Sequence, residues 1–479
     1  MTNEFFRNAV FQVSLNLAVK GVYLFAVERV VQNTLPEGDY GLYFSLLGLG
    51  ILLQVVADFG LQLYNSKELS GDRERLAVYF PYFIGLKIIL GSVFFLLLLL
   101  VGKLMGYGPE AMALLVLAGA VQFFNSVVLY LRSNLSGLGR YALDGWFSVL
   151  DKVLMTVSVG GILVFAPELL TIERFAGLQL AAWGITAVAL LVAVWSRLPN
   201  KLPRFERRRF AELLRGGAPF VMAVFLTVAY SRIDAVMIER LLPDGAIQAN
   251  HYAAAYRLLD AMNMVGWLLA GLLIPMYARM RATGEDIKPL LKFSVRLLLV
   301  GSVCVAVPLF LTAQPVVELL YDFADQRTGL ILMALALTFV AQCVNYAYGS
   351  LLSATGLIGR MNYVYAFGLL INVGGNWLLL PAHGAVGAAV MTLATQGLVS
   401  ITQLFLAHRW LEIPLGAVGF LPALLFSSLL GTCGLALFLL QTPWLLSLFL
   451  LGGGGLLVAV LTGLIDLQKL KALPSQRKL

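Results

Sequence analysis

Long apolar stretches recur along the whole sequence, separated only by short clusters of glycine, proline and charged residues. Each stretch has about 20 residues, enough to cross a hydrocarbon core roughly 30 Å thick as a helix. Hydrophobic residues make up 60% of the chain and charged residues only 13%, a balance that a soluble domain could not keep off its surface. Because a membrane helix satisfies its own backbone hydrogen bonds in lipid, the sequence predicts an all-α polytopic membrane protein without a separate soluble domain.

The apolar runs predict about fourteen transmembrane helices. The first run follows a single arginine, as in a secretory signal, but Gln12, Asn16 and Lys20 interrupt it and no small-residue cleavage site follows. We therefore expect this helix to be retained. The eleventh and fourteenth helices are the least well defined, which leaves a count of twelve or thirteen open. The expected ranges are 8–33, 40–65, 78–104, 110–131, 142–166, 173–196, 214–241, 250–277, 289–312, 328–352, 361–380, 384–408, 415–440 and 443–466.

Basic residues outside these helices predict the orientation, because Lys and Arg near helix ends favour the cytoplasm. With the N-terminus inside, the even-numbered connections and both tails carry most of these residues. The opposite connections carry only Lys103, Arg174, Arg240 and Arg327. Both termini are therefore expected in the cytoplasm of a multi-pass protein. The net charge of +8 is a topology signal first, and it is a poor argument for binding nucleic acid.

The longest basic connection lies near the middle of the chain and includes the sequence KLPRFERRRF. It either fixes the topology alone or also contacts anionic lipid head groups.

Two pairs of similar sequence segments support a division of the chain at this basic connection. The turn Ser136–Arg140 resembles Thr355–Arg360, and the run YGLY at Tyr40 resembles the run at Tyr252. The spacing fits a duplication of six helices, which predicts two bundles related by a pseudo-twofold axis along the membrane normal, with a cleft between them. The expected parts are an N-terminal bundle 1–200, a cytoplasmic linker 201–213, a C-terminal bundle 214–410, and two extra helices with a basic tail at 411–479.

Polar residues form stripes within several of the expected helices. Charge in a membrane costs roughly 2.5 to 3.5 kcal/mol per residue on insertion scales, so such residues face protein or a wet cavity. Spacings of four residues place side chains on one helix face, as for Gln12, Asn16 and Lys20. We expect the following polar residues to line a shared cavity: Gln12, Asn16, Gln54, Asp58, Asp151, Lys152, Asp234, Asp260, Asn263, Asn345, Asn372 and Asn376.

Several motifs, together with the two six-helix halves and the added C-terminal pair, carry a family resemblance. The stretches DYGLYFSLL at 39–47 and ADFGL at 57–61, with the turn GLGR at 137–140, resemble the polysaccharide flippases of the multidrug/oligosaccharidyl-lipid/polysaccharide exporter superfamily. The resemblance implies that the chain moves undecaprenyl-pyrophosphate-linked sugar units, of the O-antigen type, from the cytoplasmic to the periplasmic leaflet of a bacterial inner membrane by alternating access. Implied partners are this lipid-linked glycan, membrane lipids and other polysaccharide-assembly membrane proteins.

Three intramembrane cations are candidates for binding the pyrophosphate of such a lipid: Lys20, Arg232 and Arg257. Arginine offers a planar fork of donors to phosphate oxygens, and lysine supplies a mobile point charge. The alternative is internal neutralisation, by pairing of Arg257 with Asp260, of Arg232 with Asp234 or Glu239, and of Lys20 with Glu28.

Other functions make different predictions. A drug/cation antiporter of the same superfamily has an acidic pocket and usually twelve helices. A flippase for the peptidoglycan precursor shares the pyrophosphate, and the sequence does not separate it from our interpretation. A membrane polymerase or ligase needs a sizeable outer loop, whereas the longest outer connection, near Gln314–Gly329, has only about 15 residues.

No enzyme activity and no bound cofactor or metal are expected. Cys304, Cys343 and Cys433 lie in apolar runs without metal-ligand spacing and imply no disulfide framework. Coupling to a proton or Na⁺ gradient, through Asp58, Asp234 or Asp260, is left open.

Overall fold

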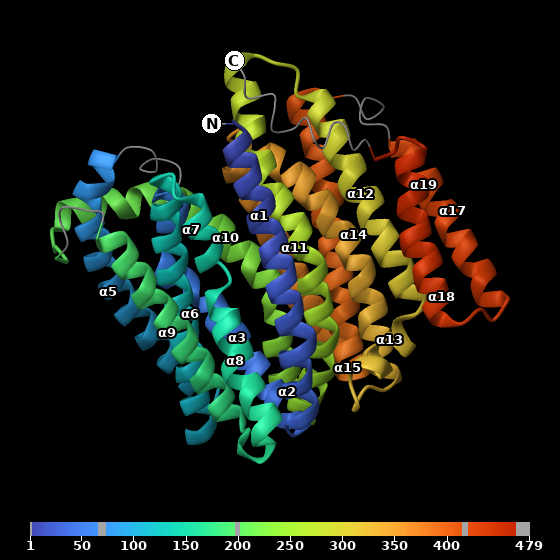
Figure 1. Ribbon diagram of the computed structural model, residues 1–479, viewed down its shortest axis with the longest axis horizontal. Helices are drawn as coiled ribbons and strands as arrows, with labels where there is room; N and C mark the ends of the chain where they lie inside the picture. Colours follow the sequence, from blue (N-terminus) through green and yellow to red (C-terminus); the bar gives the residue numbers. More distant parts are fainter. Residues whose placement is uncertain (1, 66–72, 197–201, 414–419, 466–479) are drawn as a thin grey trace. The chain divides into compact units, whose positions relative to one another are not determined.

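The computed structural model describes residues 2–65, 73–196, 202–413 and 420–465 (Figure 1). Across these ranges the chain is helical, and they contain no β-strand. Twelve of the described helices are long and apolar enough to cross a membrane. One of them, 54 residues long, contains two of the expected helices, and the first expected helix is not among the twelve. The prediction of an all-α polytopic protein with about fourteen helices is confirmed.

The chain divides into two compact units, which we describe separately. Unit 1 comprises Met1–Glu239 and Asp244–Asn250, and unit 2 comprises Arg240–Pro243 and His251–Leu479. The helix after the basic linker thus groups with the N-terminal helices. These units are defined by contacts between residues, whereas the predicted boundaries come from a sequence repeat. Those boundaries therefore stay a prediction: 1–200, 201–213, 214–410 and 411–479.

Unit 1 consists of helices of very different lengths (Figure 1). They are α1 (Thr2–Val22), η1 (Tyr23–Glu28), α2 (Arg29–Thr34), α3 (Glu37–Asp58), α4 (Leu61–Tyr64), α5 (Arg73–Leu104), α6 (Pro109–Gly137), α7 (Tyr141–Phe147), α8 (Leu150–Phe165), η3 (Pro167–Leu169), α9 (Ile172–Trp195) and most of α10 (Arg207–Leu241). The sequence predicts the long members well, because each follows one apolar run.

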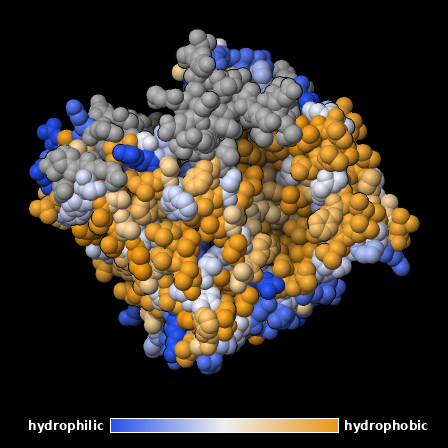
Figure 2. Space-filling view, viewed as in Figure 1, coloured by the Kyte–Doolittle hydropathy of each residue, from blue (hydrophilic) through white to orange (hydrophobic). Residues whose placement is uncertain are grey.

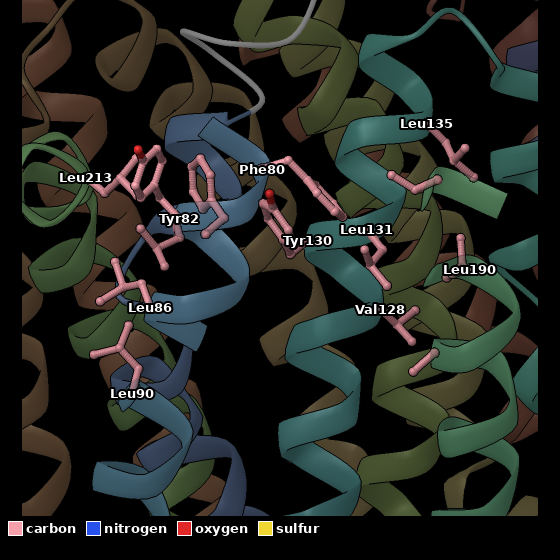
Figure 3. Close-up of a cluster of buried hydrophobic side chains, with 14 residues drawn as sticks. Phe80, Tyr82, Leu86, Leu90, Val128, Tyr130, Leu131, Leu135, Leu190 and Leu213 are labelled. Carbon is pink, nitrogen blue, oxygen red and sulfur yellow. The ribbon is translucent and has the colours of Figure 1, made fainter. Parts of the chain in front are cut away.

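A buried apolar cluster joins α5, α6, α9 and α10 of unit 1. In Figure 3, Phe80 of α5, Tyr130 and Leu131 of α6, Leu190 of α9 and Leu213 of α10 all belong to this cluster. The Tyr130 ring also stacks on Phe83, with centroids 4.9 Å apart. Offset aromatic stacking adds to the burial of apolar surface. The cluster therefore fixes α6, which carries part of the site described below, against three neighbouring helices.

Unit 2 contains most of α11 (Gly245–Thr283), then α12 (Lys288–Leu311), α13 (Ala313–Leu320), α14 (Gln326–Ala354), α15 (Ile358–Leu411), α17 (Phe420–Leu439), α18 (Trp444–Phe449), η4 (Leu450–Gly454) and α19 (Gly455–Leu461). α15 covers the expected eleventh and twelfth helices. Gly384, with φ 56° and ψ −148°, breaks it, a conformation open to glycine because it lacks a Cβ. The two added C-terminal helices pack on α12, where Phe426, Leu430 and Leu451 contact the cluster around Val303.

Several expected helices are interrupted where the sequence gives little warning. The range 142–166 forms two helices, because Val149 leaves the helical conformation with φ −126° and ψ −4°. The range 40–65 breaks at Phe59 and Gly60, which both have positive φ. The two Gly-containing turns of the repeat end their helices with the same type of C-terminal cap. Arg140 N donates to Leu135 O, and Leu357 N donates to Leu352 O. Gly139 and Gly356 both have positive φ.

The surface in Figure 2 is apolar over most of its area, and hydrophilic residues gather mainly at its edges. Many large apolar side chains are exposed along the helices, among them Leu96, Val157 and Phe165 in unit 1 and Leu370 and Phe449 in unit 2. Such a surface is stable in lipid and not in water. The protein is a multi-pass membrane protein.

Candidate functional site

Five charged side chains gather in unit 1 between α1, α6, α7 and α8. This charge cluster consists of Lys20, Arg132, Asp144, Asp151 and Lys152. The charges of Asp151, Lys152 and Arg132 all act on the ammonium group of Lys20. Three cations thus face two carboxylates, so the cluster carries an excess of one positive charge within a helical bundle. An excess cation in such a place favours the binding of an anion.

Asp144 is the most heavily hydrogen-bonded acid of the charge cluster. Arg132 donates to it through Nε at 2.7 Å and Nη2 at 3.4 Å. Gln12 Nε2 donates at 3.3 Å, and Ser136 Oγ donates at 3.1 Å. Asp144 is buried, and these hydrogen bonds with the pairing to Arg132 compensate its carboxyl group for lost solvation.

The two lysines of the cluster are held differently. Lys152 pairs with Asp151 at 3.4 Å and lies over the ring of Tyr23, 4.5 Å from its centroid. Trp183 is a second aromatic neighbour, at 6.0 Å. Lys20 is half-buried, and among the described residues it has no ion pair and no side-chain hydrogen bond. Lys20 is therefore the cation of the cluster best placed to meet an external anion.

The polar stripe of α1 explains how the cluster forms. Gln12 reaches Asp144 of α7, and Asn16 Nδ2 donates to Ser148 Oγ at 2.7 Å, just beyond α7. Lys20, one turn further along α1, lies near the first turn of α8. The spacing of four residues thus aligns three polar groups of one helix with the break between two others.

Asp58, another candidate, belongs to a separate ion pair. It lies at the end of α3 and accepts from Lys87 Nζ at 2.9 Å. Lys87 also donates to Ala57 O at 3.1 Å and to Ser126 Oγ at 2.6 Å. Gln54, one turn before Asp58, is partly buried in the same helix.

The candidates on α10 lie in unit 1 as well. Asp234 is fully buried and Arg232 is half-buried, and both interact with other residues. The backbone around them packs on α3, because Ser45 Oγ donates to Ala235 O at 2.8 Å and Gly48 lies against Arg232 O.

The remaining candidates lie in unit 2. Arg257 and Asp260 approach to 4.0 Å on α11, as their spacing predicts. Asn263 accepts a hydrogen bond from Tyr346 at 3.3 Å. Asn376 donates to Asn372 at 3.2 Å within α15, and both are fully buried. Asn345 of α14 is partly buried, and its Oδ1 lies beside Gly349.

Sequence reasoning missed Arg132 and Ser136, which it placed in a cytoplasmic connection. α6 runs on to Gly137, six residues beyond the expected end at 131. The available signal was the run RSNLS, which contains no glycine or proline and can continue a helix until Gly137. Over the described residues, no group of three His, Cys, Asp or Glu side chains could hold a metal ion.

The fold belongs to a known class of membrane transporter. A lipid II flippase, MurJ, in its inward closed conformation is 14% identical, with a TM-score of 0.66, and the match covers 97% of this chain and 98% of that one. A MATE transporter from Vibrio cholerae, VcmN, in its bent form is 17% identical, with a TM-score of 0.57 and coverage of 87% and 97%. A MOP superfamily transporter from Pyrococcus furiosus is 14% identical, with a TM-score of 0.59 and coverage of 86% and 96%. The chain therefore has the fold of MOP superfamily transporters.

The family follows from the sequence itself. The family described as "polysaccharide biosynthesis protein" matches residues 6–281, more than half of the chain. The chain belongs to this family. No curated protein matches it. The family and the fold agree with the resemblance that the sequence motifs carry.

Proposed function

We propose that this protein translocates undecaprenyl-pyrophosphate-linked oligosaccharide units from the cytoplasmic to the periplasmic leaflet of a bacterial inner membrane by alternating access. The glycan would serve a surface polysaccharide of the O-antigen type, and both termini would be cytoplasmic. Family membership supports the involvement of polysaccharide, and the fold supports transport.

The observation that carries this proposal is the excess positive charge of the charge cluster. Lys20 has no ion pair among the described residues, whereas Lys152 and Arg132 are already paired. A pyrophosphate offers several anionic oxygens and can accept from lysine and arginine together. Contacts with polar and charged side chains would spare the head group the cost of entering hydrocarbon. Arg232 and Arg257 stay candidates for further phosphate contacts.

The excess positive charge bears differently on the two competing transport functions, a drug/cation antiporter and a peptidoglycan-precursor flippase. A site for organic cations needs an excess of acidic groups, whereas here cations outnumber acids. A peptidoglycan-precursor flippase is compatible with a cationic site, since its substrate also carries a pyrophosphate. The glycan distinguishes these two lipid substrates, and an experiment has to compare them directly.

The direct test reconstitutes the full chain into liposomes and measures leaflet transfer of three substrates: an undecaprenyl-pyrophosphate oligosaccharide, lipid II and an organic dye cation. We expect rapid transfer of the oligosaccharide lipid, with little movement of the cation. Protein-free liposomes supply the background rate. Transfer of lipid II alone, or of the cation alone, would overturn the proposal.

Energy coupling belongs to the same proposal. Asp58, Asp234 and Asp260 are the acidic candidates for a proton or Na⁺ pathway, and protonation of any of them would change its interactions, such as that of Asp58 with Lys87 and that of Asp260 with Arg257. Imposing either ion gradient on the same liposomes should accelerate transfer. Equal rates with and without both gradients would exclude this part of the proposal.

A further inference from the structure

The donors around Asp144 are of the kind that bind phosphate. A guanidinium, a side-chain amide and a hydroxyl converge on this buried carboxylate from Arg132, Gln12 and Ser136. Phosphate oxygens accept from the same groups, and arginine binds carboxylate and phosphate in the same forked geometry. Arg132, the strongest of these donors, can therefore bind a phosphate oxygen in place of the carboxylate oxygen.

Arg132 is accessible to a second anion while it holds Asp144. Its side chain is 21% exposed. Nε and Nη2 are directed to Asp144, whereas Nη1 donates to no residue in the described ranges. The guanidinium also lies close enough to Lys20 for the two charges to interact. An anion attracted by Lys20 can thus contact Arg132 before Asp144 is released.

Asp144 lies on a helix that can respond to the loss of one ion pair. α7 has only seven residues, with Gly139 at φ +75° before it and the non-helical Val149 after it. Arg132 and Ser136 tie it to α6, and Gln12 ties it to α1. Breaking the pair with Arg132 would therefore loosen one short helix and leave the long helices α6 and α8 intact.

We propose that Asp144 is an internal competitor of the substrate for Arg132. This inference rests on the proposed function and adds a regulatory residue to its site. When the pyrophosphate approaches Lys20, Arg132 transfers its hydrogen bonds from Asp144 to a phosphate oxygen. Asp144 keeps Gln12 and Ser136 as partners, and α7 loses its ion pair with α6. The returning carboxylate then displaces the phosphate, so that the lipid is bound reversibly and can leave.

The first test measures binding of undecaprenyl pyrophosphate to the purified full chain. Asp144→Asn keeps the size of the side chain and removes its charge, so the competitor is weakened. We expect the Kd to fall about five- to ten-fold, in the range of a typical coupling between sites, while leaflet transfer slows because release is slower. Glu110→Gln, which removes an exposed carboxylate from the first turn of α6, should leave the Kd unchanged.

A double-variant comparison assigns the effect to Arg132. Arg132→Gln should weaken binding, and Arg132→Gln combined with Asp144→Asn should bind no more tightly than Arg132→Gln alone. Unchanged or weaker binding by Asp144→Asn overturns the inference. So does tightening of equal size in the absence of Arg132.

A third measurement keeps Asp144 in place and follows α7 directly. Trp146 is 59% exposed on α7, and Trp146→Cys can be alkylated in a Cys433→Ser background, since Cys304 and Cys343 are buried. Undecaprenyl pyrophosphate should change the alkylation rate, and Arg132→Gln should abolish that change. A rate unaffected by the lipid contradicts the loosening of α7.

The two proposals fail in different ways. If wild type binds and transfers no pyrophosphate lipid, the proposed function falls. If wild type binds and transfers it, and Asp144→Asn has the wild-type Kd, only the role of Asp144 as a competitor falls.

Discussion

Lys87 illustrates how a cation is kept inside a membrane bundle. Its side chain is 4% exposed, and its ammonium group donates to Asp58, to Ser126 and to the carbonyl of Ala57. These three acceptors satisfy the three donors that lysine has. Lys87 therefore stabilises the end of α3, whereas Lys20 has no such set of partners among the described residues.

Removing one member of this pair should be costly. In Lys87→Met, Asp58 loses its partner, and because Asp58 is 23% exposed the loss of stability should lie below the roughly 3 kcal/mol that breaking a fully buried pair costs. We expect a clearly lower melting temperature in detergent, and recovery of much of the loss in Lys87→Met/Asp58→Asn. A single variant as stable as wild type would show that the pair contributes little.

The sequence predicts the location of those site residues whose placement depends on helical spacing alone. Gln12, Asn16 and Lys20 recur every four residues, so they share one face wherever the helix lies. The membrane location of Lys152 follows from its place within an apolar run. Arg132 depends on where α6 ends, and the mostly polar run after residue 131 contains no strong stop signal before Gly137. Its pairing with Asp144 is a tertiary contact that periodicity does not contain.

At the scale of helices, the sequence predicts how long the helices are but not where they break. Apolar runs predict the long helices because membrane thickness sets their length. The break between α7 and α8 has no proline or glycine at Ser148–Val149. There, Ser148 Oγ donates to Gly145 O and accepts from Asn16 of α1. Contacts between helices thus accompany this break, and a single run of sequence does not reveal them.

Close packing of α3 on the first turn of α11 requires glycine at position 41. A Cβ placed there would lie 1.8 Å from Ala246 O and 2.7 Å from Asn250 N. We expect Gly41→Ala to destabilise the protein by at least about 1 kcal/mol, because two backbones must separate. Gly184→Ala on α9 is the control, since its Cβ meets no atom within 4 Å. Similar melting temperatures for the two variants would contradict this packing.

The stability of the first turn of α14 should decrease at acidic pH. Asp325 caps the helix and accepts from the backbone N–H groups of Arg327 and Thr328. Partial burial alone would raise the pKa of Asp325, but the hydrogen bonds from Thr328 and the charge of His251 lower it below the ordinary value. The folded pKa is thus the lower one, so the stabilisation is full above the unfolded pKa and is lost as pH falls through the folded pKa.

Hydrogen exchange in the first turn of α14 checks this cap. We expect faster exchange as the pH falls below the ordinary range of an aspartate, after correction for the intrinsic pH dependence. Asp325→Asn keeps an N-cap and should remove this additional pH dependence, whereas Asp325→Ala should cost about 1 kcal/mol at neutral pH. A cap equally protected at all pH values would contradict the role of the carboxylate.

For the whole molecule, the orientation in the membrane is the first property to test. The distribution of Lys and Arg places Arg207 on the cytoplasmic side and Arg327 on the opposite side. In a Cys433→Ser background, an impermeant maleimide applied to spheroplasts should label Arg327→Cys and spare Arg207→Cys. Both side chains are exposed, so the reverse pattern would mean that the topology is inverted.

The central claim is that the charge cluster between α1, α6, α7 and α8, with its excess positive charge, binds the pyrophosphate of a lipid-linked glycan during transfer. The most direct measurement is the initial rate of leaflet transfer of an undecaprenyl-pyrophosphate oligosaccharide in liposomes. We expect Lys20→Gln and Lys152→Gln each to slow transfer about ten-fold, a loss of roughly 1.4 kcal/mol. Lys103→Gln, exposed at the far end of α5, should transfer at the wild-type rate. Wild-type rates in both cluster variants would contradict the account.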